Sequence, residues 1–474
     1  MKYMWEGRFK DKVAYEVIEF TKSIDIDKKL AFYDIKGSIA HTKMLSKVGL
    51  ITKIDEERII NGLKKIEEEI RKNKFKILPT DEDIHTAIER RLIKLVGKSG
   101  EKLHTGRSRN DQIVLDEKLY LKEEIINLLN YIIDFQKTLL EKSEEYFGVI
   151  IPSYTHLKQS QPVLLSHYFL AYIEKFERDK ERFLISYDKN NVLPLGVGAC
   201  AGTNLPLDRE YVAKLLNFSK ISNNSLDTVS DRDFLIEILF NCVLSLIHLS
   251  NFCEDLIIWN TDEFSFINLP DKYCTGSSLM PHKKNPDVLE LIRSKAAIAI
   301  GNLTGILTLI KGLPLSYNRD LQEDKKPLFE TIEILKSSLK ILTKIVKETK
   351  FNVEKIKNSI SSFTLATDIA EYLVKKGIPF RNSHKIVGKI VNYCIENKKE
   401  IISLTLEEFK NFSPIFNKEI FNVLNFENSV DSKKVIGGTS STNVKMEIEK
   451  WKKNLKKSSI HILSLKKANS TLKK

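Results

Sequence analysis

The segment spanning residues 276–287 carries the densest group of residues that could do chemistry. Its sequence, GSSLMPHKKNPD, places two serines and two lysines between long apolar segments. Gly276 permits backbone angles that are closed to other residues. The lysines and the free N–H groups of a loop or helix start would stabilise a developing carboxylate dianion, and Ser277 or Ser278 could accept a proton. These residues predict an anion-stabilising catalytic loop, although their composition is equally typical of an exposed surface loop.

Four further polar clusters interrupt the apolar pattern of the chain. They occupy residues 104–112 (HTGRSRNDQ), 154–162 (YTHLKQSQP), 230–233 (SDRD) and 317–325 (YNRDLQEDK). The planar guanidinium groups of the first cluster suit carboxylates, and the histidine of the second changes its charge near neutral pH. Each cluster alone has a plainer interpretation: a helix cap at Ser108 or Asn110, an exposed histidine, a helix start or a charged loop. Their joint presence favours a substrate-binding site.

Long helices must position these clusters. Residues 113–147 contain no glycine or proline, and their apolar residues recur with helical spacing. Such a helix would be about 50 Å long, at ~1.5 Å per residue. Similar patterns cover residues 161–187, 231–260, 286–309 and 328–346, and none of these stretches shows sustained strand alternation. We therefore predict an all-α protein whose central bundle of long helices packs within the chain and against other subunits of an obligate oligomer.

The chain divides into three predicted domains. Residues 1–107 form an N-terminal helical domain, residues 108–360 a central helix bundle with the polar clusters, and residues 361–474 a C-terminal helical domain. Lysine is densest from Lys445 to Lys474. This lysine-rich tail is predicted to be a solvated, frayed terminus.

Composition restricts the class of protein. An apolar fraction of 42% with 29% charged residues is typical of a soluble globular chain. The net charge of +13 comes from lysines spread over most segments, which argues against a nucleic-acid-binding surface. Five scattered cysteines without a C-x-x-C pair indicate neither disulfides nor a zinc site, and favour a reducing compartment. The N-terminus lacks an apolar signal core and no run of about 18 apolar residues occurs, so we expect a cytoplasmic protein without a membrane partner.

Together the clusters resemble the signature regions of the fumarase/aspartase superfamily, and over nearly the whole chain they are similar to its argininosuccinate lyase branch. Further matching segments are MWEGRF at 4–9, DEDIHTAIE at 81–89, ATDIAEYL at 366–373 and GIPFR at 377–381. The resemblance implies a homotetramer with a twenty-helix core and active sites shared between three subunits. It also implies reversible cleavage of argininosuccinate to arginine and fumarate, the last step of arginine biosynthesis, without metal or organic cofactor.

The resemblance further implies a role for each matching residue. Ser277 is the expected base, Lys283 and Asn285 stabilise the aci-carboxylate that it creates, and His156, supported by Glu290, protonates the departing nitrogen. The implied substrate contacts are Ser23, Asp27, His85, Ser108, Arg109, Asn110, Thr155, Arg232, Tyr317, Gln322 and Lys325. Cationic and amide groups suit the substrate carboxylates, and acidic or hydroxyl groups suit its amino and guanidinium ends.

One position departs from the pattern of this branch. His282 stands where many argininosuccinate lyases have glutamine, and MPHK is also the pattern of adenylosuccinate lyase. The clusters at 104–112 and 317–325 favour the argininosuccinate branch over that alternative. A catalytically silent structural relative, such as a lens protein, is a further alternative. Such a protein is expected to have lost substrate-binding or catalytic residues, which this sequence retains.

Overall fold

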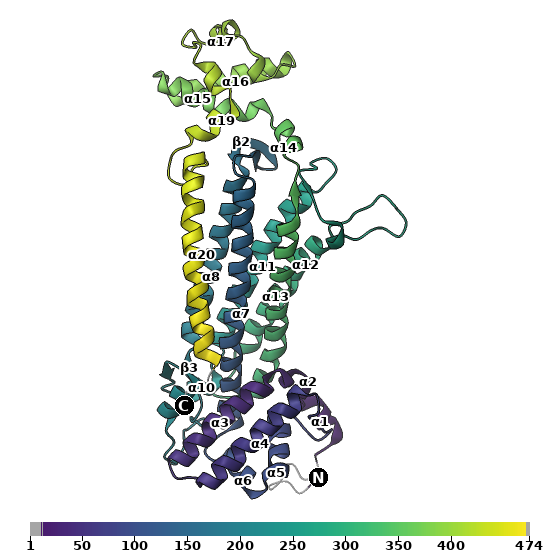
Figure 1. The fold of residues 1–474 in the computed structure, drawn as a ribbon, viewed down its shortest axis with the longest axis vertical. Helices are drawn as coiled ribbons and strands as arrows, with labels where there is room; N and C mark the ends of the chain where they lie inside the picture. The colour runs from purple at the N-terminus through teal and green to yellow at the C-terminus, as the bar shows by residue number, and fades with distance from the viewer. Residues whose placement is uncertain (1–10, 12, 471–474) are drawn as a thin grey trace.

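The chain folds into an elongated and almost entirely helical molecule. A computed structural model describes residue 11 and residues 13–470. Figure 1 shows three levels along the long axis: N-terminal helices at the bottom, a bundle of long helices in the middle and short helices at the top. The prediction of an all-α fold is confirmed, with only short two-stranded pairs of strands among the described residues.

Five long helices form the central bundle. They are α7 (Arg109–Glu145), α8 (Leu165–Asn190), α11 (Asp233–Trp259), α12 (Asp287–Ile310) and α13 (Lys325–Glu348). With 37 residues, α7 is the longest described helix, and it extends about 55 Å at ~1.5 Å per residue. The bundle core is continuous, and its centre holds edge-to-face contacts from Phe135 to Phe176 and Phe252. These helices supply the rigid axis on which the polar clusters are mounted.

The segment before α8 folds as a hairpin, not as the first turn of a helix. β1 (Ile150–Thr155) pairs antiparallel with β2 (Lys158–Leu164), so the predicted helical start at residue 161 is wrong. Pro152 lies opposite Pro162 in this hairpin, and proline lacks the N–H group that a helix interior requires. Ser153 completes the pairing, because its hydroxyl donates to the carbonyl of Gln161 and accepts from the same residue's N–H.

The N-terminal helices form a second core that extends onto the bundle. They are α1 (Tyr15–Thr21), α2 (Ile24–Asp27), α3 (Ala31–Lys47), α4 (Lys53–Arg71), α5 (Ile84–Val96) and α6 (Lys98–Glu101), of which α2 to α5 supply the apolar residues of this core. Leu115 and Leu119 of α7 belong to this core, together with residues of α9 (Arg209–Leu216). The lower end of α7 is therefore fixed between the N-terminal helices and the bundle.

The helices at the top have a small core of their own. This core is supplied by α15 (Ala366–Lys375), α16 (Phe380–Glu396), α17 (Leu406–Phe412) and α18 (Ile420–Val423), whereas α14 (Val353–Ser359) and α19 (Phe426–Ser432) bury Ile356 and Val430 in the bundle core. Tyr372 stacks on Phe416 within this core. The remaining short elements are α10 (Ser225–Ser230), β3 (Val192–Leu193) with β4 (Lys220–Ile221), β5 (Ile267–Asn268) with β6 (Lys350–Phe351), η2 (Lys28–Leu30), η3 (Lys102–His104), η4 (Asp271–Tyr273), η5 (Arg319–Asp324), η6 (Ser362–Leu365) and η7 (Ile401–Ser403).

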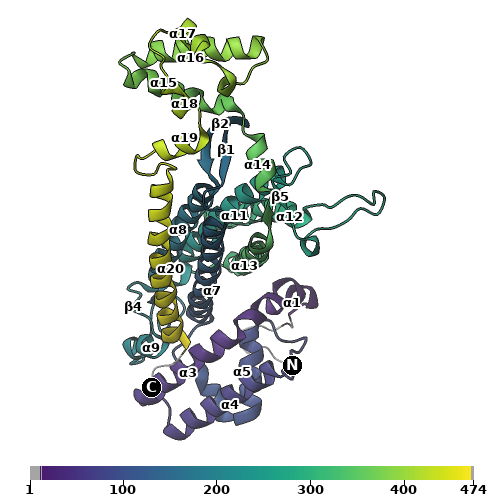
Figure 2. The ribbon, with the colours of Figure 1, turned by 45° about the horizontal axis from the view of Figure 1, so that its top comes forward.

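The lysine-rich end of the chain is a long packed helix. α20 (Ser441–Ser470) returns from the top and runs down the side of α7 and α8, as the yellow ribbon in Figure 2 shows. Its buried apolar residues include Ile448, Trp451 and Leu455, which join the bundle core. The prediction of a frayed, solvated terminus is therefore wrong up to residue 470, and residues 471–474 lie outside the described part. The apolar stripe outweighs the lysines because they need cover only the outer face.

One bundle helix is strongly apolar along its length. α11 is long and apolar enough to pass for a membrane span, and it is the one described helix that does so. Just over half of its most apolar stretch, 56%, is buried inside the chain, where it packs against α8, α12 and α13. A core helix with several neighbours needs this composition, and burial by other helices explains it without a lipid environment.

Candidate active site

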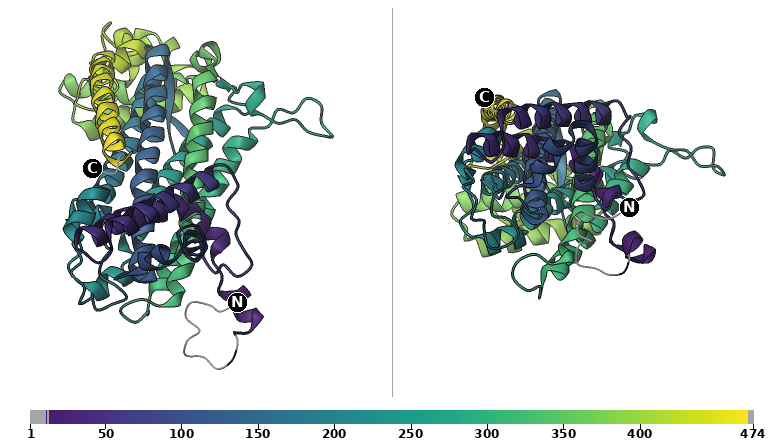
Figure 3. Two further views of the ribbon diagram at one scale, coloured as in Figure 1. Left: turned by 60° about the horizontal axis from the view of Figure 1, so that its bottom comes forward. Right: turned by 90° about the horizontal axis from the view of Figure 1, so that it is seen from below.

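The predicted site residues lie at three separate places of the chain. The first, here called the basal cluster, lies where the N-terminal helices meet the lower ends of α7, α11 and α13. The second is the tip of the β1–β2 hairpin near the top of the bundle, and the third is the loop of residues 275–286 before α12. Figures 1 and 3 show this loop extending away from the body of the molecule. One chain alone does not bring Ser277, His156 and Lys325 together.

Four fully buried charges form the centre of the basal cluster. Arg232 donates from Nε to the carboxylate of Asp324, and its Nε lies 3.8 Å from Oε2 of Glu117. The Lys325 ammonium lies 3.2 Å from Asp324 and 3.6 Å from Glu117. Sequence reasoning named the two cations but missed both carboxylates. Glu117 follows the motif at 104–112 in the predicted long helix, and a charged residue among its apolar residues was the signal that could have identified it.

The N-terminal segment closes one side of the basal cluster. The hydroxyl of Ser23 donates to the carboxylate of Asp27. Burial raises the pKa of Asp27, while the charges of Lys325 and His85 oppose that rise. Asp27 and Lys325 are far apart in the sequence, yet the charge of Lys325 acts on the Asp27 carboxyl. These two predicted substrate contacts therefore share one electrostatic environment.

The segment around η5 is attached to the same N-terminal residues. Gln322 donates from Nε2 to the carbonyl of Thr21 at 3.2 Å, and Arg319 donates to the same oxygen at 2.8 Å. Burial raises the pKa of Tyr317, and the nearby charge of Lys325 opposes this. These bonds keep the predicted contacts Tyr317, Gln322 and Lys325 against the N-terminal helices.

The motif at 104–112 builds the other side of the basal cluster. Ser108 is the N-cap of α7 and forms a capping box with Asp111, so its hydroxyl is occupied by the helix start. Arg109 lies 3.4 Å from Asp83 and 3.7 Å from Glu89. Asn110 donates from Nδ2 to the carbonyl of Ala199 at 3.1 Å. The capping interpretation is correct for Ser108, whereas the Arg109 side chain points at carboxylates.

His85 lies between two buried carboxylates. Its Nδ1 is 3.3 Å from Asp34 and 3.3 Å from Asp116. Despite burial, His85 and Arg107 lower the pKa of Asp34, whereas burial and the charge of Asp34 raise the pKa of Asp116. His85, Asp34 and Asp116 lie close enough together to be considered as metal ligands. However, the guanidinium of Arg107 and the amide of Gln112 already compensate the charge of Asp34. We interpret the group as an ion-paired support for His85.

The hairpin tip presents Thr155 and His156 to solvent. His156 and Leu157 have positive φ values of 54° and 58°, which two-residue type I′ turns require. Side chains other than glycine rarely adopt these angles, so the turn is conformationally costly. Gln159 holds the hairpin by donating to the carbonyl of Ser359 at 2.8 Å and accepting from the N–H of Ser361 at 2.9 Å. Among the described residues, no side chain forms a hydrogen bond or ion pair with the His156 ring.

The projecting loop is closed at its base and internally ordered around Ser277. Two backbone bonds join Thr275 and Asn285, at 3.2 and 2.8 Å. The Ser277 Oγ accepts hydrogen bonds from the N–H groups of Leu279 at 3.2 Å and Met280 at 3.0 Å. Amide donors on this oxygen favour its negatively charged form. The φ of Gly276 is not positive, so the loop does not use the backbone freedom that glycine permits at this position.

The two loop lysines have different surroundings. Lys284 lies 2.6 Å from the carboxylate of Asp271 and donates to Asn268 at 2.9 Å. Lys283 is exposed and has no ion-pair partner among the described residues. Glu290 is also exposed, one turn into α12. In this loop Lys284 is therefore already ion-paired, whereas Lys283 is free to bind an anionic ligand.

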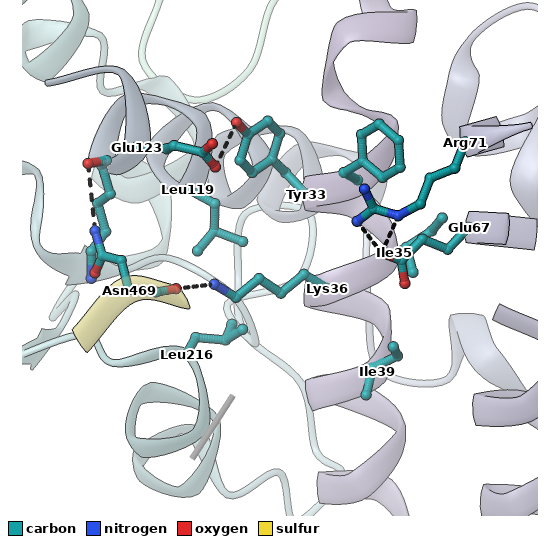
Figure 4. Close-up of a pocket in the computed structure, with 12 residues that line it drawn as sticks. Tyr33, Ile35, Lys36, Ile39, Glu67, Arg71, Leu119, Glu123, Leu216 and Asn469 are labelled. Carbon is teal, nitrogen blue, oxygen red and sulfur yellow. Dashed lines mark hydrogen bonds and ion pairs between the residues drawn. The ribbon is translucent and has the colours of Figure 1, made fainter. Parts of the chain in front are cut away.

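A cavity of about 310 Å³ lies apart from these three places (Figure 4). It is lined by α3, α4, α7, α9 and the end of α20, and no predicted site residue contributes to it. Lys36 donates to the carbonyl of Asn469 at 2.8 Å, and the Tyr33 hydroxyl donates to Glu123 at 3.0 Å. Because these polar groups satisfy one another, we assign no ligand to this cavity.

Comparison with known proteins identifies the class first. A family model described as lyase matches residues 7–301. The fold superposes on EDDS lyase in complex with formate with a TM-score of 0.86 at 26% identity, covering 96% of this chain and 92% of that one. It also matches the class II fumarase of Schistosoma mansoni, with a TM-score of 0.70 at 18% identity over 88% and 93% of the two chains, which is a likeness of fold alone. The chain is thus a lyase of the fumarase/aspartase superfamily.

Sequence relatives narrow this class. A model described as argininosuccinate lyase C-terminal matches residues 363–431. The argininosuccinate lyase of Sulfurihydrogenibium sp. (strain YO3AOP1) is 51% identical over 96% of this chain and 99% of its own length. That of Aquifex aeolicus is 49% identical over 95% of this chain and 98% of its own length. This chain belongs to the argininosuccinate lyase family of carbon–nitrogen lyases.

Proposed function

We propose that the chain cleaves argininosuccinate reversibly to L-arginine and fumarate, as the last step of arginine biosynthesis in the cytoplasm. The observation that carries this proposal is the 51% identity to an argininosuccinate lyase over 96% of the chain. The proposal includes a homotetramer, the domains 1–107, 108–360 and 361–474, and no metal or organic cofactor. Nucleic acid and membrane are not among its proposed partners.

Exposed apolar side chains support an oligomer with shared sites. On α12, Leu291 and Leu307 are 57% and 49% exposed, and the same helix also exposes Ile298 and Ile300. These side chains lie on both sides of the buried face of α12, and this much exposed apolar surface on a bundle helix is typical of one that meets further neighbours. Packing of the α11–α12 face against other subunits would cover it and build the proposed twenty-helix core.

The two projecting segments carry apolar residues of the same kind. Leu157 at the hairpin tip is 79% exposed, and Leu279 in the loop is 83% exposed. Each lies within two residues of a proposed catalytic side chain, His156 and Ser277. A neighbouring subunit that covered these leucines would bring the catalytic residues against its own surface. This supports an active site assembled from a basal cluster, a hairpin tip and a loop of different subunits.

Ser277 is the proposed base of the elimination. It removes the proton from the carbon beside a succinate carboxylate, and the electron pair passes into that carboxylate as an aci-carboxylate. The amide N–H groups of Leu279 and Met280 would stabilise the Ser277 alkoxide that this step needs. Lys283 and Asn285 then balance the second negative charge of the intermediate. Lys284, already paired with Asp271, is the less suitable cation.

The second half of the reaction breaks the C–N bond. The electron pair of the aci-carboxylate forms the double bond of fumarate, and the pair of the C–N bond goes to the guanidinium nitrogen. His156, supported by Glu290, is proposed to donate the proton that completes arginine. The proposed substrate contacts are Ser23, Asp27, His85, Ser108, Arg109, Asn110, Thr155, Arg232, Tyr317, Gln322 and Lys325.

A substrate assay tests the proposal directly. Purified protein is given argininosuccinate and adenylosuccinate separately, and fumarate is followed by its ultraviolet absorbance. We expect release from argininosuccinate. Release from adenylosuccinate alone would replace the substrate assignment, and release from neither would favour the silent structural relative.

A further inference from the structure

Glu117 is a buried carboxylate for which the proposed mechanism has no use. Its side chain is fully inaccessible, and neither oxygen accepts a hydrogen bond of ordinary geometry from a described residue. It nevertheless lies 3.6 Å from the ammonium of Lys325 and 3.8 Å from the guanidinium of Arg232. A buried charge without hydrogen bonds is costly, so its persistence in contact with two proposed substrate-binding cations calls for a role.

The charges of this group balance without a ligand. Arg232 and Lys325 contribute two positive charges, and Glu117 and Asp324 two negative ones, and all four side chains are buried. A substrate carboxylate that approached Lys325 would add a third negative charge where water cannot screen it. One proton taken up by a carboxylate would restore the balance.

We propose that Glu117 takes up one proton from solvent when a substrate carboxylate binds to Lys325, so that its buried charge weakens substrate binding at alkaline pH. The inference rests on the proposed function, because it takes Lys325 as a substrate contact. Glu117 touches no substrate in this scheme and is a positioning residue. The protonated carboxyl would donate a hydrogen bond to Asp324, which stays ionised between the two cations.

Of the two buried carboxylates, Glu117 and Asp324, the surroundings favour protonation of Glu117. The net pKa of Glu117 is raised to about 7, because burial and the charge of Asp324 raise it more than Arg232 and Lys325 lower it. Burial acts in the same direction on Asp324, but Lys325 and Arg232 lower the pKa of that carboxyl overall. The other charged or titratable groups facing the cluster are Asp27, His85, Asp116, Lys118, Asp231 and Tyr317.

The sign of the pH dependence follows from this linkage. Binding favours the protonated form of Glu117, so its pKa is higher in the complex than in the free protein. Substrate affinity is therefore complete below the free pKa and falls as pH rises through it. With a free pKa of about 7, half of Glu117 is already ionised at about pH 7, and KM should rise by up to about 16-fold between there and pH 8.5, because each pH unit well above the free pKa costs up to a factor of ten.

Steady-state kinetics with argininosuccinate test this inference in the full-length enzyme. We expect the Glu117→Gln variant, which carries no charge at this position, to have a KM that is flat over this pH range. At pH 8.5 its KM should be up to about 30-fold below that of the unmodified protein, with kcat within about twofold. Glu117→Asp keeps the charge and should keep the rise in KM.

Glu124→Gln is the matched control. Glu124 is another buried carboxylate of α7, it pairs with Lys336 at 2.8 Å, and it touches no proposed substrate contact. Its variant should retain the pH dependence of the unmodified protein. The inference is overturned if the unmodified enzyme shows a flat KM, an outcome that does not depend on how any variant folds, or if Glu117→Gln keeps the rise. Absence of fumarate release from argininosuccinate at every pH would instead overturn the proposed function, and this inference with it.

Discussion

The basal cluster and the projecting segments are built in opposite ways. Arg232 and Lys325 are buried and paired with carboxylates of their own chain. His156 and Lys283 are exposed and have no ion-pair partner among the described residues. Because an unpaired buried charge is costly, the two proposed binding cations must be compensated when the chain folds. In the proposed oligomer, substrate binding is prepared within one subunit, whereas the proposed catalytic groups obtain their surroundings on assembly.

Among the variants considered, removal of the proposed base in the projecting loop should have the largest effect on activity. Ser277→Ala is expected to lower kcat by about 10²–10⁴, the usual contribution of a general base, or more. The oligomer should persist, because the loop is not part of the bundle core, and gel filtration checks this. Ser278→Ala is the matched control and should keep most activity. The opposite result, with Ser278 essential and Ser277 dispensable, would move the base to the neighbouring hydroxyl.

Loss of a basal carboxylate should act on stability. Asp324→Asn leaves Arg232 and Lys325 with a single buried counter-charge, and we expect the free energy of unfolding to fall by about 3–5 kcal/mol. Denaturant unfolding followed by circular dichroism measures this. Asp320→Asn changes an exposed carboxylate in the same short helix and should be nearly neutral. Equal stability of the two variants would show that the cluster is not held by its charge pairs.

Mixing two inactive variants probes assembly of the site. Ser277→Ala and His156→Asn are each expected to be inactive alone. If loop and hairpin tip of one site come from different subunits, mixed oligomers contain some sites with both residues intact, and activity should rise at least about tenfold over either parent. Fumarate release after unfolding and joint refolding measures it. No recovery, with subunit exchange verified by a mass tag, would place both residues of a site on one subunit.

The smallest effect is expected at Ser108. Its hydroxyl caps α7, so Ser108→Ala should cost about 1 kcal/mol of stability, the usual value of an N-cap. If capping is its whole function, KM should stay within about twofold. Ser108→Thr keeps the cap and should restore stability. A KM that rises strongly in the alanine variant would assign Ser108 to substrate binding as well.

The long helices and most of the polar motifs followed from local pattern. Helical spacing predicted α7, α11, α12 and α13, and the capping interpretation at Ser108 was correct, because both depend on residues within a few positions of each other. The hairpin at 150–164 was not predicted, because its two strands are short and show little alternation of apolar and polar residues. The burial of α20 was not predicted, because its many lysines obscure the apolar stripe that packs on α7 and α8.

The sequence by itself determined the family, the helical class and the chemical groups available for an elimination, since these depend on residue types and their spacing. Only the tertiary structure decided their surroundings. It placed Glu117 and Asp324 beside Arg232 and Lys325, paired Lys284 with Asp271, and aimed two amide groups at Ser277. The physical reason is that desolvation and charge compensation are set by neighbours distant in the chain, which spacing along the sequence does not reveal.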